Sequence, residues 1–234
     1  MEYCPKSLKE EMKEKLKFSE EQLKKILRDI CMGLSYLHRS DIVHLDIKPG
    51  KFLFLNVNSP FLKENILISK TNKYKLGDMG QSALAKLSSD EIEEGDARYL
   101  APELLNSEEY AEKTELTKAD VFSLGITLFE LATGFNIPMN GNEWHDLRNE
   151  RLDVLDNVHH LSDSFKKVIK LMLKRDPTQR PSVKELLTKY LPDQLEVALK
   201  WEKIERNLLR MEKEALEKKK EQENKNTKVR RMSI

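Results

Sequence analysis

His44-Leu45-Asp46-Ile47-Lys48-Pro49 is the most informative stretch of this chain, and two shorter motifs follow it, Asp78-Met79-Gly80 and Ala101-Pro102-Glu103. Each motif alone is a weak signal, because an isolated aspartate is more often a turn or helix-cap residue. The three motifs together are a more specific signal, because they follow one another in a fixed order and each lies next to the kind of segment that its chemistry requires. Asp46 follows a long amphipathic segment, and Asp78 follows a short strand-like one.

The segments around these motifs predict a mainly helical domain with a small β-structure. Residues 19–39 place Leu and Ile at helical spacing behind a Ser19–Gln22 capping box, which predicts an amphipathic helix. Residues 121–132 are apolar nearly all round, as in a helix at the centre of a domain. Further helices are expected over 163–174 and 182–190, and short strands over 66–69 and 74–77.

The composition gives no indication of a nucleic-acid or membrane partner. Basic and acidic residues nearly balance, 41 against 40 in 234 residues, and no apolar run is long enough to span a bilayer. No signal peptide is recognisable at the start. The two cysteines, Cys4 and Cys31, fit a reducing compartment better than a disulfide framework. We therefore expect a soluble protein of the nucleus or the cytoplasm.

The charged residues of the motifs suit the transfer of a phosphoryl group. That reaction needs a base beside the attacking hydroxyl, a cation near the transferred phosphate and oxygen ligands for Mg²⁺. Asp46 is placed as the base, Lys48 can reach the phosphate, and Asp78 can hold the metal ion. We interpret Asp46 and Lys48 as catalytic residues.

The ordered motifs resemble those of protein kinases. The resemblance implies an α+β protein-kinase-like fold in which Glu103 and Arg180 form a buried salt bridge and Asp120 orients the loop of Asp46. It also implies that His44 supports this loop without acting in catalysis. Because the chain begins at a hinge-like segment, we expect a mainly helical C-terminal lobe with a small β piece, and a missing N-terminal lobe.

Three segments narrow the resemblance to the Wee family, whose members inhibit cyclin-dependent kinases by phosphorylating their glycine-rich loop. The family's features here are Leu45 between His44 and Asp46, Gly95-Asp96 in the activation segment, and Gly141-x-x-Trp144-His145 after the central helix. The resemblance implies a tyrosine or threonine acceptor, a cyclin-dependent kinase as partner, and negative control of mitotic entry. Since the usual arginine at the position of Leu45 pairs with a phosphorylated activation segment, we expect no activation by such phosphorylation.

The resemblance also implies ATP and Mg²⁺ as cofactors. Glu2 and Cys4 correspond to the family's hinge and would hold adenine through their backbone groups, with Leu67 below the ring. Asn65 and Asp78 would ligate the metal ion.

Residues 50–63 interrupt the family's spacing. The catalytic asparagine is expected five residues after the catalytic aspartate, but Lys51 stands there, and Asn65 comes into register only when residues 50–63 are removed. We hypothesise that this Phe- and Leu-rich block is translated from an unremoved intron. The alternative is a genuine insertion that forms an excursion and lets Asn65 return to the site.

The chain divides into three predicted regions. Residues 1–192 form the kinase domain, as hinge and C-terminal lobe only, residues 193–217 form a charged amphipathic helix, and residues 218–234 are a disordered tail. In the tail, Arg230-Arg231 precede Ser233 and are placed to direct a basophilic kinase to it. Two interpretations stay open: an unmodified solvated tail, and a phosphorylated Ser233 that binds a phosphoserine-binding adaptor as partner.

Two functions stay open. The first is an active kinase with the roles given above. The second is a catalytically inactive module, a lone C-terminal lobe that binds a substrate kinase without modifying it. A gene-model fragment of a longer, active enzyme is the plainest explanation of the short N-terminus.

Overall fold

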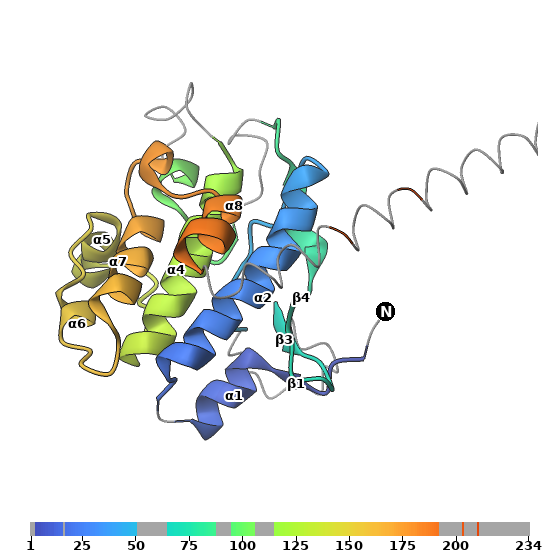
Figure 1. The fold of residues 1–234 in the computed structure, drawn as a ribbon. Coiled ribbons are helices and arrows are strands. Elements are labelled where there is room, and N and C mark those ends of the chain that lie inside the picture. Colours follow the sequence, from blue (N-terminus) through green and yellow to red (C-terminus); the bar gives the residue numbers. More distant parts are fainter. Residues whose placement is uncertain are drawn as a thin grey trace, which may run out of the picture. The chain divides into compact units, whose positions relative to one another are not determined.

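Two long helices form the centre of the fold. The computed structural model describes residues 3–15, 17–50, 65–87, 95–105, 115–191, 203 and 210. Within them, α2 (Glu20–Arg39) packs against α4 (Thr117–Thr133), and α4 lies between α2 and the smaller helices α6 and α7 (Figure 1). The predicted amphipathic and central helices are thus confirmed.

Local sequence explains why both helices form where they do. The Ser19–Gln22 capping box is present at the start of α2, and the stripe from Leu23 to Leu34 is buried. Every residue of α4 from Lys118 to Ala132 is buried, as the continuous apolar pattern predicts. The helix ends at Gly134, whose positive φ of 70° is a conformation that glycine adopts easily.

The other helices in the described residues are shorter. They are α1 (Leu8–Glu14), α5 (Asn142–Arg148), α6 (Asp153–Asp156), α7 (Asp163–Met172) and α8 (Val183–Glu185), with a π-helical turn over Leu186–Tyr190 and 3₁₀ turns over Met79–Gln81, Pro102–Leu104 and Pro177–Gln179. Helices were expected at α7 and α8, but not at α1, α5 or α6. No helix in the described ranges combines the length and apolar character of a bilayer span.

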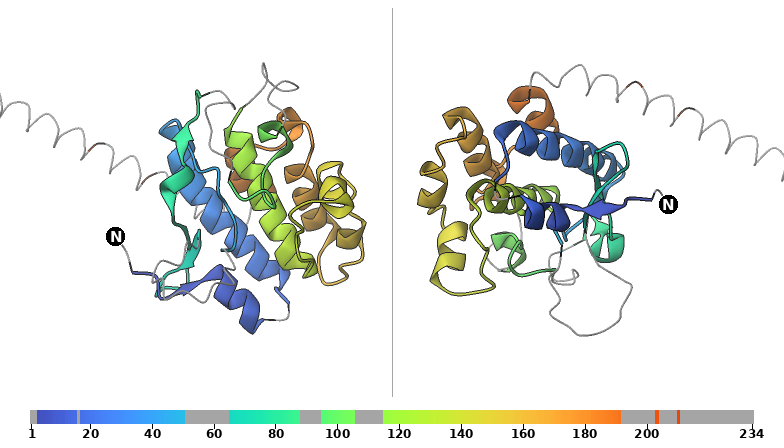
Figure 2. Two further views of the ribbon diagram at one scale, coloured as in Figure 1. Left: turned by 180° about the vertical axis from the view of Figure 1, so that it is seen from behind. Right: turned by 90° about the horizontal axis from the view of Figure 1, so that it is seen from below.

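In the part of the chain that the structure describes, five short strands form two sheets. In the first, β1 (Lys6–Ser7), β3 (Ile66–Ile68) and β4 (Tyr74–Leu76) are antiparallel in the order β1-β3-β4. This sheet lies beside α2, on the side away from α5, α6 and α7 (Figure 2). In the second, β2 (Ile42–Val43) pairs with β5 (Ala83–Leu84). The two predicted strands are confirmed, each ending one residue early.

Residues 1–191 form one compact unit, and residues 192–234 form a second. Of the second unit the structure describes Lys203 and Arg210, both helical. The predicted helix over 193–217 is otherwise outside the described residues, as are the predicted tail over 218–234 and Ser233, so these stay predictions.

A buried ion pair ties the Ala101-Pro102-Glu103 motif to the C-terminal part of the first unit. Arg180 donates from Nη1 and Nη2 to the two carboxylate oxygens of Glu103 at 2.6 and 2.8 Å, and both side chains are fully buried. Arg180 also lies over the Phe122 ring, 4.8 Å from its centroid. The expected salt bridge is confirmed.

Replacing one partner of this pair should be strongly destabilising. We expect Glu103→Gln to lower the free energy of unfolding by about 3–5 kcal/mol, because it leaves the Arg180 charge buried without a counter-ion. Urea denaturation of purified protein measures this. Asp41→Asn is the matched control, since its ion pair with Lys86 is long, at 3.7 Å, and exposed; it should change stability by less than about 0.5 kcal/mol. Equal effects of both changes would contradict the assignment.

Candidate active site

Asp120, in the first turn of α4, fastens the loop that carries Asp46. Its side chain is fully buried and accepts the backbone N–H groups of His44 and Leu45 at 2.9 and 2.8 Å. A third contact comes from His38 Nε2, at 2.8 Å. Leu45 has a positive φ of 62°, which is unfavourable for a leucine and is held by these bonds. The expected supporting role of Asp120 is confirmed by this geometry.

His44 connects the loop to the end of β4. Its Nδ1 accepts the backbone N–H of Asp46 at 3.3 Å, so the ring proton sits on Nε2, which donates to the Gly77 carbonyl at 3.0 Å. The residue is fully buried. Both ring nitrogens are therefore engaged in holding backbone, as expected for a residue without a catalytic role.

Asp46, Lys48 and Asn65 come together in the structure. Lys48 Nζ forms an ion pair with Asp46 Oδ1, and its side chain is 2% exposed. Asn65 Nδ2 donates to Asp46 Oδ2 at 2.6 Å and also to the Asp46 carbonyl. Asn65 thus returns to the loop although residues 50–63 separate them. The origin of that block stays a hypothesis, and residues 51–63 lie outside the described part of the chain.

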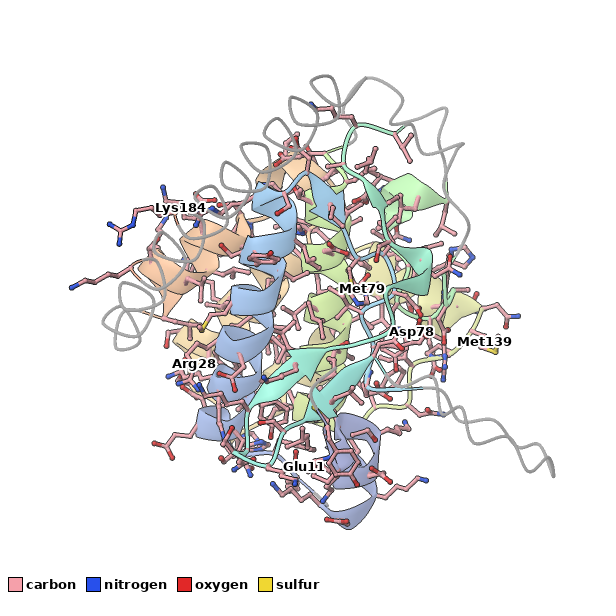
Figure 3. The ribbon with its side chains drawn as sticks, turned by 90° about the vertical axis from the view of Figure 1, so that its right-hand side faces the viewer. Glu11, Arg28, Asp78, Met79, Met139 and Lys184 are labelled. Carbon is pink, nitrogen blue, oxygen red and sulfur yellow. The ribbon has the colours of Figure 1, made fainter. Side chains whose placement is uncertain are left out.

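Asn65 and Asp78 stand at the same end of the β3–β4 hairpin. The backbone N–H of Gly77 donates to the Asn65 carbonyl at 2.9 Å, which continues the strand pairing and sets Asp78 beside this point. Asp78 has a positive φ of 50° and accepts the Gly80 N–H at 3.2 Å. Figure 3 shows Asp78 and Met79 where the chain leaves β4.

This pair suits a hard divalent cation. Because the amide nitrogen of Asn65 is turned to Asp46, the amide oxygen faces the other way, and it is buried without a hydrogen-bond partner. A buried oxygen without a partner is costly unless something binds it. Together with the Asp78 carboxylate it offers the oxygen ligands that Mg²⁺ prefers. The residues therefore fit the metal ion that the sequence predicts, and their role as ligands stays a prediction.

The residues expected around adenine are only partly described. Cys4 is half-buried and leads into β1, which pairs with β3 so that Ser7 lies opposite Leu67. The chain that carries Cys4 therefore runs into the strand beside Leu67. Glu2 lies outside the described residues. Binding of adenine by these residues stays a prediction.

The segment that starts at Gly95 passes directly against the loop that carries Asp46. A Cβ atom on Gly95 would lie 2.9 Å from the Leu45 carbonyl oxygen, too close for any residue except glycine. The next residue, Asp96, accepts hydrogen bonds from Arg98 at 3.0 and 2.7 Å. Burial opposes ionisation of Asp96, but the Arg98 contact and the charge of Lys48 hold the pKa of its carboxyl below the usual value.

Asp96 was not predicted as a site residue. The charge of Lys48 helps to lower the pKa of its carboxyl, so Asp96 belongs to the electrostatics of the site. In the sequence, the Gly95-Asp96 dipeptide could have indicated this residue, but it serves above only as evidence of the family resemblance.

Tyr99 attaches the same segment to α4. Its hydroxyl donates to Glu130 Oε2 at 2.6 Å, and its carbonyl accepts from Ser123 Oγ at 2.8 Å. Burial raises the pKa of Glu130 above its ordinary value, although the Tyr99 hydrogen bond and the charge of Lys9 work in the opposite direction. The ionised form of Glu130 is therefore less favourable in the fold than in the unfolded chain.

This makes the stability contribution of Glu130 depend on pH. The folded pKa is raised, so the contribution is fully present below the ordinary value of 4.5 and is lost as pH rises through the folded pKa. We expect Glu130→Gln, which still accepts the Tyr99 hydroxyl, to be at least as stable as wild type at pH 7, by up to about 1 kcal/mol.

Thermal unfolding of both proteins between pH 4.5 and 7 measures the difference. Wild type should gain stability relative to the variant as the pH is lowered. A variant that is clearly less stable at pH 7, with a difference that does not change with pH, would show that the ionised carboxylate is stabilising instead.

Comparison with known proteins gives similarities over most of the chain. The protein kinase domain family matches residues 1–191. Wee1-like protein kinase 2 of Ailuropoda melanoleuca is 37% identical over 199 residues, 79% of this chain and 34% of that protein. Wee1-like protein kinase 1-B of Xenopus laevis is 34% identical over 212 residues, 83% of this chain and 34% of that protein.

A third relative, Wee1-like protein kinase 2 of Danio rerio, is 39% identical over 176 residues, 72% of this chain and 32% of that protein. The chain therefore spans about a third of the length of these curated relatives, 32–34% in each case.

Proposed function

This chain belongs to the protein kinase family and is of the Wee type, and from that premise we propose that it binds MgATP and transfers the γ-phosphate to a protein hydroxyl. The observation that carries the proposal is the orientation of Asn65. Its amide nitrogen donates to Asp46, the proposed base, and its amide oxygen is buried without a hydrogen-bond partner. The same side chain can therefore hold the base and offer an oxygen ligand to the metal ion.

The proposed roles follow from the contacts. The Asp46 carboxylate accepts the proton of the attacking hydroxyl and orients it, and Lys48 at Asp46 Oδ1 places a positive charge beside the transferred group. Asn65 and Asp78 would hold Mg²⁺, which when bound neutralises charge on the phosphates. Cys4 and Leu67 would contact adenine, together with Glu2.

The acceptor is proposed to be a tyrosine or a threonine in the glycine-rich loop of a cyclin-dependent kinase. The support is the Wee-type sequence at Leu45, at Gly95-Asp96 and at Trp144-His145, together with the names of the relatives. On the same ground we propose negative control of mitotic entry as the role, and the nucleus or the cytoplasm as the location.

A transfer assay tests this proposal. The chain is incubated with MgATP and a peptide that carries the glycine-rich loop of a cyclin-dependent kinase, and mass spectrometry locates the added phosphate. We expect phosphate on the tyrosine or threonine of the loop, and a rate about a hundredfold or more lower for Asp46→Asn, because the base is lost.

Asp41→Asn serves as the control, since Asp41 is exposed and pairs only weakly with Lys86. The proposal fails if wild type binds MgATP but transfers no phosphate. In that case the chain would be a binding module, and it should still retain the substrate kinase in a pull-down. Equal rates for wild type and Asp46→Asn would also contradict it.

A further inference from the structure

Arg148 is a buried cation with an unusual environment. It ends α5 and is 4% exposed. In the part of the chain that the structure describes, no carboxylate forms an ion pair with it. Burial lowers the pKa of its guanidinium to about 9, so the group is still charged at neutral pH. A charge buried without a counter-ion is unfavourable unless polar groups surround it.

The polar groups that surround it are carbonyls of the segment after Gly95. Arg148 Nη2 donates to the carbonyls of Ala97 and Leu100 at 2.8 and 2.7 Å, with a longer contact to that of Arg98 at 3.3 Å. Hydrogen bonds from a charged donor are stronger than neutral ones. The Arg148 side chain thus contacts three carbonyls of residues 97–100, a segment that has no regular secondary structure.

Trp144 completes this contact. Its Nε1–H donates to the Ala97 carbonyl at 2.9 Å, and its ring lies under the guanidinium of Arg148, 3.7 Å from centroid to Cζ. Arg148 Nη1 in turn donates to the Trp144 carbonyl at 3.2 Å. The two residues lie one helical turn apart on α5, so they act on residues 97–100 as one unit, the Trp144–Arg148 clamp.

The segment under the clamp is also tied to the catalytic loop. Gly95 lies against the Leu45 carbonyl and the Asp46 carboxylate, and the charge of Lys48 helps to lower the pKa of Asp96. Leu45 itself is buried and apolar. At the position of Leu45 there is consequently no cation to receive a phosphorylated residue of this segment. The clamp supplies a cation from α5, and this cation binds the backbone of the segment rather than a modified side chain.

We propose that Trp144 and Arg148 are positioning residues that hold residues 97–100 in the shape that receives the protein substrate, so that α5 sets this segment without its phosphorylation. The part concerning substrate rests on the function proposed above. The part concerning the order of the segment does not, and it can be measured in a chain without transferase activity.

Three variants test the clamp. Arg148→Gln removes the charge and most of the donors, and Trp144→Phe keeps an aromatic ring, although a smaller one, but removes the N–H. Arg151→Gln is the matched control, because Arg151 is an exposed arginine just beyond α5 that pairs with Asp146. Two measurements are made on the whole chain: amide hydrogen exchange of residues 95–101, and the KM values for MgATP and for the peptide substrate.

We expect exchange in residues 95–101 to accelerate about tenfold or more in Arg148→Gln, and by a smaller factor in Trp144→Phe, in proportion to the bonds lost. Exchange in α2 and α4 should stay as in wild type, and Arg151→Gln should change nothing. The KM for the peptide should rise with the exchange rate, while the KM for MgATP stays the same.

Unchanged exchange in residues 95–101 would overturn the proposal, as would an equal acceleration throughout the first unit, which would show a merely structural role. If Arg148→Gln does not fold, Trp144→Phe decides by the same criteria. If exchange rises but the peptide KM does not, the segment is held by the clamp without serving the substrate, and the proposal is wrong. An inactive wild type with the expected exchange pattern contradicts only the proposed function.

Discussion

The Asp120 carboxylate holds the loop that carries Asp46 to the central helix, and the geometry of the candidate site depends on this attachment. The group is fully buried and accepts hydrogen bonds from the backbones of His44 and Leu45 and from the ring of His38. A buried carboxylate needs such partners. They in turn fix Leu45 in a conformation that a leucine rarely adopts, which turns Asp46 toward Asn65.

Hydrogen bonds and close contacts connect this loop to the other segments of the site. His44 bonds to the Gly77 carbonyl and thereby fixes the position of Asp78, and Asn65 bonds directly to Asp46. The segment at Gly95 comes close because no side chain intervenes. Each contact joins residues far apart in sequence, so the site exists only when the helices and the small sheet are packed together.

Much of this was predictable, because the signals are local. Capping boxes and the spacing of apolar residues predict α2, α4 and α8. The motifs indicate the family, which the relatives confirm. The short helix α1 was missed although Ser7 and Glu10 form a capping box at its start. The contact of Trp144 and Arg148 with residues 97–100 could not be predicted from the sequence, because no periodic pattern relates positions so far apart in the chain.

In the site proposed here Asp46, on the loop held by Asp120, binds MgATP together with Asn65 and Asp78 at the end of the β3–β4 hairpin. Thermal unfolding with ATP, with and without Mg²⁺, tests it most directly. We expect a stabilisation that requires both ATP and Mg²⁺, of about 2.7 kcal/mol at a hundredfold excess over Kd. It should be lost in Asp78→Asn but not in Asp41→Asn. Absence of any shift, or an equal shift without Mg²⁺ or in Asp78→Asn, would contradict it.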